Sequence, residues 1–280
     1  MKKLFLSLLM TFFVVPSTLA CTLFGANGIA VKGGGTLVAK NRDWYPGFQD
    51  VRLVTPITGY KYYALMTGKN YSFNAGGINE KGLFVAMSTA GSIPKNARKM
   101  YPKFHTSDGK RTNDYILNHF SSVLETLESS VQIWSEPVNF ILADKDSVAV
   151  IEVLPGGLRS ITFQQNGSIY QTNHYVHPSA KKYNIKIGKS SLTRYNRIQE
   201  LFNEHIGLLT WEDFWTMSQD QNAGPTDSIF RVGNKPKGEK TVAELIAKLP
   251  PDGKFVLEVR YQPTSDAKQW LKKTITSTDF

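Results

Sequence analysis

The chain contains one cysteine, Cys21, and its position is the first chemical feature of the sequence. Residues 1–20 have the form of a secretory signal peptide, with a positively charged start, an apolar run over residues 4–15 and small or neutral residues up to Ala20. Cleavage after Ala20 would make Cys21 the first residue of the mature chain. We therefore predict a signal peptide over 1–20, one mature domain over 21–280, and export to the periplasm or the extracellular space.

An N-terminal cysteine carries a thiol and an α-amine on the same residue. The thiolate is a strong nucleophile, and the amine, whose reference pKa is near ~8, can act as the base for its own thiol. Cys21 in this position therefore suggests a hydrolase that uses its N-terminal residue as the nucleophile. A lone thiol also excludes an intrachain disulfide.

The elements that follow Cys21 must position the other reacting groups. Two β-like runs, 22–31 and 36–41, flank the segment Gly33-Gly34-Gly35, which predicts a hairpin with a glycine turn. The second run leads into a group of polar residues, 40–44. The hairpin would fold this polar group back beside Cys21.

The polar group supplies a carboxylate and two cations. Within the hairpin, Asp43 can hold or orient the α-amine, and either Lys40 or Arg42 can favour the thiolate. The alternative is a charged strand end on the protein surface.

A second group of candidates lies further along the chain. A glycine-bounded turn and the apolar run 83–87 lead into Ser88 and Thr89, which are candidates to line a pocket. Asn173 follows four β-like runs, and its amide can donate to the oxyanion that forms when a carbonyl is attacked. These runs are predicted to form one β-meander, with a hairpin at Asn166-Gly167: 138–143, 148–154, 158–163 and 168–172.

Helical spacing of apolar residues predicts helices over 110–130 and 190–205, the second capped by Ser190 or Ser191. Arg194 and Arg197 lie three residues apart in the second helix, so one of them can point into a site while the other is solvated. Residues 242–249 have helical composition but precede a convincing strand over 255–261, so helix and strand both stay open for them. His174 and His177 lack the accompanying ligands of a metal site, and we predict no metal there.

Five segments of the sequence, taken together, resemble a known enzyme group: Cys21-Thr22, Asn41-Arg42-Asp43-Trp44, Asn79-Glu80-Lys81-Gly82-Leu83, Thr172-Asn173-His174-Tyr175 and Ser190-Ser191-Leu192-Thr193-Arg194-Tyr195. The chain resembles the linear-amide C–N hydrolases of the N-terminal-nucleophile (Ntn) class, which include choloylglycine (bile salt) hydrolases, penicillin V acylases and acyl-coenzyme A:6-aminopenicillanic acid acyltransferase-like proteins. Arg42 and the Thr-Asn-His-Tyr segment look closest to the acyltransferase-like branch. Bile salt and penicillin V enzymes have an arginine where this chain has Lys40.

The resemblance implies an α+β fold, a four-layer αββα sandwich with Cys21 on a central strand. It also implies Cys21 as nucleophile and base, Asp43 at the α-amine, Asn173 in the oxyanion hole and Arg194 steadying the nucleophile region. No metal or organic cofactor is implied. The expected substrate is a small N-acyl amide, cleaved as a linear amide through an acyl-enzyme.

Three other function classes compete with this amidohydrolase. An acyltransferase would differ only in the group that resolves the acyl-enzyme. A lipoprotein with a binding or structural role would carry its lipid on Cys21, but the residue three places earlier is Thr18 and not the usual leucine. Nucleic-acid binding rests only on the formal charge of +10, whose lysines are scattered. We therefore expect neither a nucleic-acid partner nor a stable membrane anchor, and homo-oligomerisation stays open.

Overall fold

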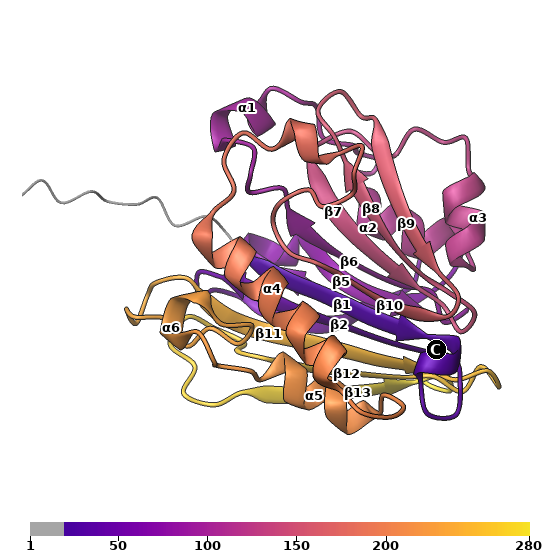
Figure 1. Cartoon of the computed structure of the whole chain (residues 1–280). Helices are drawn as coiled ribbons and strands as arrows, with labels where there is room; N and C mark the ends of the chain where they lie inside the picture. Colours follow the sequence, from indigo (N-terminus) through magenta and orange to yellow (C-terminus); the bar gives the residue numbers. More distant parts are fainter. Residues whose placement is uncertain (1–19) are drawn as a thin grey trace, which may run out of the picture.

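A computed structural model describes residues 20–280, so all but the last residue of the predicted signal peptide lies outside the described residues. Two antiparallel sheets pack face to face, and helices cover the outer face of each sheet (Figure 1). The apolar side chains between the sheets form the largest buried cluster, which includes Leu23, Val38, Phe84 and Ile141. The predicted αββα sandwich is confirmed.

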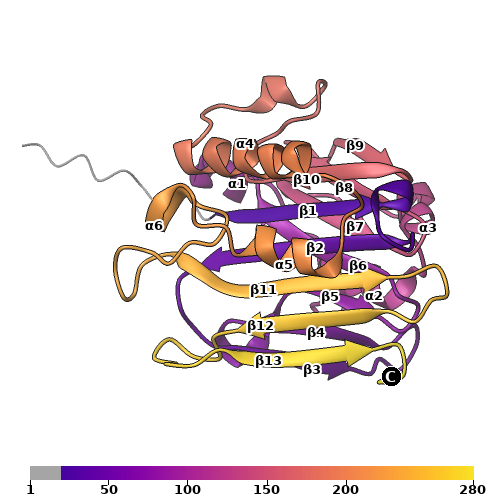
Figure 2. The same cartoon turned by 60° about the horizontal axis from the view of Figure 1, so that its bottom comes forward.

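The first sheet holds the strand that begins at Cys21. Its neighbouring strands β1 and β2 form the predicted hairpin, although the first strand ends at Asn27 and a short 3-10 helix, Gly28–Ala30, begins the turn. The strand order, visible in Figure 2, is β10 (Gly167–Gln171), β1 (Cys21–Asn27), β2 (Thr36–Trp44), β11 (Lys240–Leu249), β12 (Val256–Tyr261) and β13 (Leu271–Thr276).

The second sheet is built from strands that follow one another in sequence, so each strand pairs with its neighbour in the chain. Its order is β3 (Gln49–Val54), β4 (Tyr62–Thr67), β5 (Phe73–Asn79), β6 (Phe84–Thr89), β7 (Val138–Ala143), β8 (Val148–Val153) and β9 (Arg159–Gln164).

The helices divide between the two outer faces. On the second sheet, α2 (Thr112–His119) packs against β5 and β6, and its apolar side chains join those of α3 (Val123–Glu128). On the first sheet, α4 (Lys189–Glu204) crosses β1 and β10, and α5 (Trp211–Ser218) lies on β2 and β11 (Figure 1). Two short helices, α1 (Lys95–Lys99) and α6 (Gly224–Asp227), complete the set. No helix within residues 20–280 has the length and apolar character needed to cross a membrane.

The meander prediction is wrong in its last step. The pair Asn166-Gly167 does not close a hairpin within one sheet, because β9 is the edge of the second sheet while β10 pairs with β1 in the first. Turn residues specify a local reversal of the chain, but they do not specify which sheet offers the free strand edge.

Two helix predictions also need correction. The region 110–130 contains two helices, because the chain is extended at Phe120 and Ser122 caps a new helix by accepting from the N–H of Glu125 (3.1 Å). The helix predicted over 190–205 is α4, but its N-cap is Gly188 and not Ser190 or Ser191.

Residues 242–249 belong to β11 and are therefore a strand. Alanine, glutamate, leucine and lysine favour a helix in isolation. Here β11 lies between β2 and β12 and pairs with both, and the sheet contacts override the local propensity.

Candidate active site

The hairpin register decides which polar side chains share a face with the thiol. Cys21 lies opposite Arg42, and Leu23 lies opposite Lys40. Because side chains alternate along a strand, Lys40 and Arg42 point to the same face as Cys21, toward the second sheet, while Asp43 points to the helix-covered face. The polar group 40–44 is therefore split between the two sides of one strand.

A cavity of about 500 Å³ opens on the thiol side. Cys21, Lys40 and Arg42 lie in its wall, together with Thr89 and apolar side chains such as Phe73 and Met87. Its lining contains seven cationic residues and one carboxylate: Lys40, Arg42, Lys95, Arg98, Lys99, Lys103, Arg111 and Glu136. The cavity is thus apolar in part and strongly electropositive.

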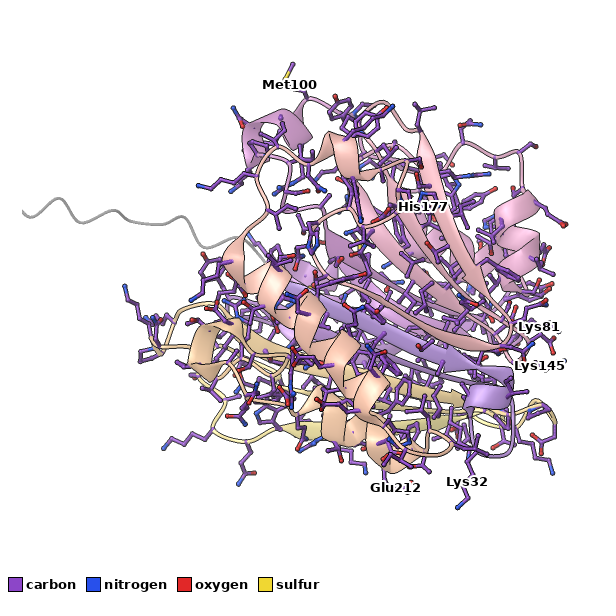
Figure 3. The ribbon with its side chains drawn as sticks, viewed as in Figure 1. Lys32, Lys81, Met100, Lys145, His177 and Glu212 are labelled. Carbon is purple, nitrogen blue, oxygen red and sulfur yellow. The ribbon has the colours of Figure 1, made fainter. Side chains whose placement is uncertain are left out.

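The rim of the cavity is formed by α1 and by the loop that follows β2. Trp44, the last residue of β2, and Phe48 in this loop are 39% and 59% exposed although both are large and apolar. Beyond the last residue of α1, Met100 points away from the molecule (Figure 3). The cavity lining therefore includes both cationic side chains, from α1, and apolar side chains, from β2 and the loop after it.

The thiol of Cys21 is buried, and burial raises its pKa. Lys40 opposes this effect more strongly than Arg42 does, because a positive charge stabilises the thiolate. Burial lowers the pKa of Lys40 to about 8 and that of Arg42 to about 10. The ammonium of Lys40 donates to the carbonyl of Ala75 (2.6 Å). This hydrogen bond holds the ammonium on the same side of the sheet as the thiol.

The backbone of Cys21 is held by residues from two distant segments. Its N–H donates to Oδ1 of Asn173 (2.9 Å), and its carbonyl accepts from the guanidinium of Arg194 (2.6 Å). Arg194 also donates to the same Asn173 oxygen (2.9 Å) and to the hydroxyl of Thr22 (2.9 Å). The Asn173 amide nitrogen donates to the carbonyl of Thr89 (2.8 Å), so the orientation of this amide is fixed.

Asp43 lies on the opposite side of β2, fully buried. Its Oδ1 accepts from the hydroxyl of Thr241 (2.7 Å), and its Oδ2 lies 3.6 Å from the guanidinium of Arg231. Burial raises the pKa of Asp43 to about 6, and the charges of Arg194 and Arg231 oppose that rise.

The structure brings together seven of the eight residues predicted for the site. Cys21, Lys40, Arg42 and Thr89 line the cavity, while Asp43, Asn173 and Arg194 contact or surround the start of β1. Ser88 needs correction as a substrate-binding candidate. It is buried, is absent from the cavity wall, and donates its hydroxyl to the carbonyl of Thr172 (2.5 Å).

The two histidines and the second arginine are not part of the cavity wall. His174 contacts the hydroxyl of Ser191 (2.8 Å), and burial lowers its pKa to about 4. His177 lies away from β1 (Figure 3) and contacts Ser179. Arg197, one helical turn from Arg194, forms a partly buried ion pair with Asp220.

Sequence reasoning missed three residues around Asp43: Arg231, Glu239 and Thr241. Arg231 lies in the loop between α6 and β11, Glu239 directly precedes β11, and Thr241 lies within it. Their only sequence signal is the alternation of charged and polar residues before an apolar run, which is common on protein surfaces.

Comparisons with solved structures identify the fold. Penicillin V acylase from Agrobacterium tumefaciens is similar at a TM-score of 0.51 and 14% identity, over 93% of this chain and 87% of that chain. A mutant of conjugated bile acid hydrolase from Clostridium perfringens is similar at a TM-score of 0.52 and 14% identity, over 91% and 96%. Comparison with curated protein sequences gives no match. The fold is that of the Ntn hydrolases.

The family follows from a second finding. The model of the acyl-coenzyme A:6-aminopenicillanic acid acyl-transferase family matches residues 31–256. The chain belongs to this family, and the expected membership is confirmed. Its function is accordingly of the Ntn amidase or acyltransferase type.

Proposed function

We propose that this protein is an exported cysteine amidohydrolase that cleaves a linear amide of a small N-acyl compound. The observation that carries the proposal is the position of Cys21: its side chain lines an electropositive cavity while its backbone nitrogen contacts Asn173. Removal of residues 1–20 would turn that nitrogen into an α-amine at the same place.

In the proposed reaction the thiolate of Cys21 attacks the amide carbonyl, and the α-amine takes the thiol proton and passes it to the leaving amine. Asn173 uses one N–H on Thr89 and has a second for the oxyanion. Water then hydrolyses the acyl-enzyme. An acceptor amine in place of water would give an acyltransferase, and export away from acyl-coenzyme A pools favours hydrolysis.

The cavity also supports a small-molecule substrate. Its volume of about 500 Å³ is within the range of ligand sites, and its wall combines apolar side chains with several cations. The apolar part suits an acyl chain. Burial of the Cys21 thiol favours a nucleophile over a lipid anchor, because a diacylglyceryl group on this sulfur would have to occupy the cavity.

The test is to express the full-length gene with export intact and to measure the mass of the mature protein before and after thiol alkylation. We expect a chain that begins at Cys21, with a free amine and one alkylatable thiol. This protein should cleave members of a panel of N-acyl amides, and its Cys21→Ala variant should not.

A control uses the same chain retained in the cytoplasm with residues 1–20 attached, which should be inactive because Cys21 then has no free amine. Full activity of this precursor would contradict the amine as base. A diacylglycerol adduct on Cys21, or an N-terminus elsewhere, would contradict the proposed enzymatic function.

A further inference from the structure

A buried ionic cluster surrounds the peptide bond between Ala20 and Cys21. Ala20 is 1% exposed, and its N–H donates to Oε1 of Glu239 (2.5 Å). The same Glu239 oxygen accepts from the guanidinium of Arg231 (2.9 Å), which also lies 3.6 Å from Asp43. Arg231 thus links two carboxylates beside the residue that the mature chain would lose.

The cluster contains hydrogen-bonding atoms without partners among residues 20–280. Oδ2 of Asp43 and Oε2 of Glu239 are both buried and accept no hydrogen bond, and Nε of Arg231 is buried and donates none. Unpaired buried acceptors are rare because each costs desolvation free energy. Two carboxylate oxygens near the start of β1 can therefore each accept a further hydrogen bond.

Cleavage before Cys21 supplies donors of the right number and charge. In the uncut chain the nitrogen of Cys21 has one N–H, which donates to Asn173. The ammonium of a free N-terminus has three N–H bonds, so two further N–H donors become available. Cleavage also removes Ala20 and with it the N–H that Glu239 accepts.

We propose that Glu239, held in place by Arg231, is a positioning residue that accepts the N–H of Ala20 before cleavage and receives the α-amine of Cys21 after it. This inference rests on the proposed function, which makes Cys21 the N-terminal residue. The α-amine of Cys21 would then lie near two carboxylates, those of Asp43 and Glu239. The guanidinium of Arg231 partly balances their negative charge.

The proposal predicts how charge changes act on the amine. The charged and titratable groups that face the start of β1 come from β2, from the segment after β10, from α4 and from the segment before β11: Lys40, Arg42, Asp43, His174, Arg194, Arg231 and Glu239. A nearby carboxylate stabilises the ammonium, whereas a nearby guanidinium destabilises it.

The single cysteine gives a direct measurement. Processed protein labelled only with 13C,15N-cysteine shows one spin system, whose pH titration reports the macroscopic pKa values of the thiol and amine pair. Glu239→Gln keeps the size of the side chain and removes its charge, so we expect the amine titration to move down by about one pH unit. Arg231→Gln removes the balancing cation, so it should move the amine titration upward.

The matched control is Glu244→Gln, a buried carboxylate on β11 that bonds to Ser218 and lies outside the cluster. It should leave the Cys21 titration unchanged. If Arg231→Gln fails to fold, Glu239→Gln decides alone. Shifts of opposite sign in the two variants would support the proposal, since a purely structural salt bridge would change thermal stability without moving the amine titration.

The same titration separates this inference from the proposed function. An unchanged amine pKa in Glu239→Gln, in protein whose mass proves an N-terminal Cys21, overturns the role of Glu239 and leaves the amidohydrolase standing. The predicted shifts in protein without amidase activity support the role of Glu239 and contradict the amidohydrolase. A mass that retains residues before Cys21 overturns both.

Discussion

At the scale of single residues, the ionisation of Cys21 depends on two cations that share its face of the sheet. Arg42 lies opposite Cys21 in the strand register, but Lys40 has the larger effect on the thiol pKa. The guanidinium of Arg42 donates to the hydroxyl of Thr67 and lies over the ring of Trp44, at the rim of the cavity. Lys40 is thus the main support of the thiolate.

This ranking can be measured by alkylation, because the chain has one thiol. We expect Lys40→Met to move the pH profile of iodoacetamide alkylation upward by about one pH unit, since loss of a cation destabilises the thiolate. Arg42→Met should move it less. A larger shift for Arg42→Met would reverse the assignment.

At the scale of elements, α4 holds the start of β1 through one buried side chain. Arg194 is 0% exposed and binds the Cys21 carbonyl, the Thr22 hydroxyl and the Asn173 amide oxygen. It therefore joins α4, β1 and the segment after β10. The packing of α4 on Phe24 and Ala26 of β1 places its guanidinium at this junction.

Replacing Arg194 should therefore affect stability as well as catalysis. Arg194→Met removes this donor from the Cys21 carbonyl and the Thr22 hydroxyl, while the Asn173 oxygen keeps only the Cys21 N–H. We expect a loss of about 3 kcal/mol or more in the free energy of unfolding, measured by urea denaturation. The control is Arg197→Gln, one turn away, whose ion pair with Asp220 is partly exposed and should cost less than about 1 kcal/mol. Equal losses in the two variants would contradict a special role for Arg194.

At the scale of the whole molecule, the sandwich buries acidic groups whose proton binding couples to folding. Glu244 of β11 lies under α5, where its carboxylate accepts from the hydroxyl of Ser218 (2.7 Å). Burial raises its pKa to about 7. Because the folded state then binds the proton more tightly than the unfolded state, stability is highest at low pH with respect to this group and falls as pH rises from about 4.5 to about 7.

Glu244→Gln tests this coupling, because glutamine cannot ionise. Relative to the parent protein, the variant should gain stability between pH 5 and pH 8, by about 2–3 kcal/mol at most. Thermal unfolding at the two pH values measures the difference. If the gap between the two proteins stays constant over this range, Glu244 does not titrate within it.

The sequence alone determined the hairpin and the fold class. The run of glycines favours a local reversal of the chain, and the reversal returns the polar group 40–44 to the side of Cys21. These relations are short-range, so residue order is enough to set them. The family motifs added the αββα sandwich, which the structure bears out.

Only the tertiary structure decided the long-range neighbours. Insertion of β11 beside β2 brings Glu239 to Ala20 across 219 residues of sequence, and the passage of β10 to the first sheet brings Asn173 to Cys21 across 152. Local propensity argued for a helix over 242–249, and turn composition argued for a meander. Both were overridden because strand edges and apolar faces are satisfied by partners that no local pattern identifies.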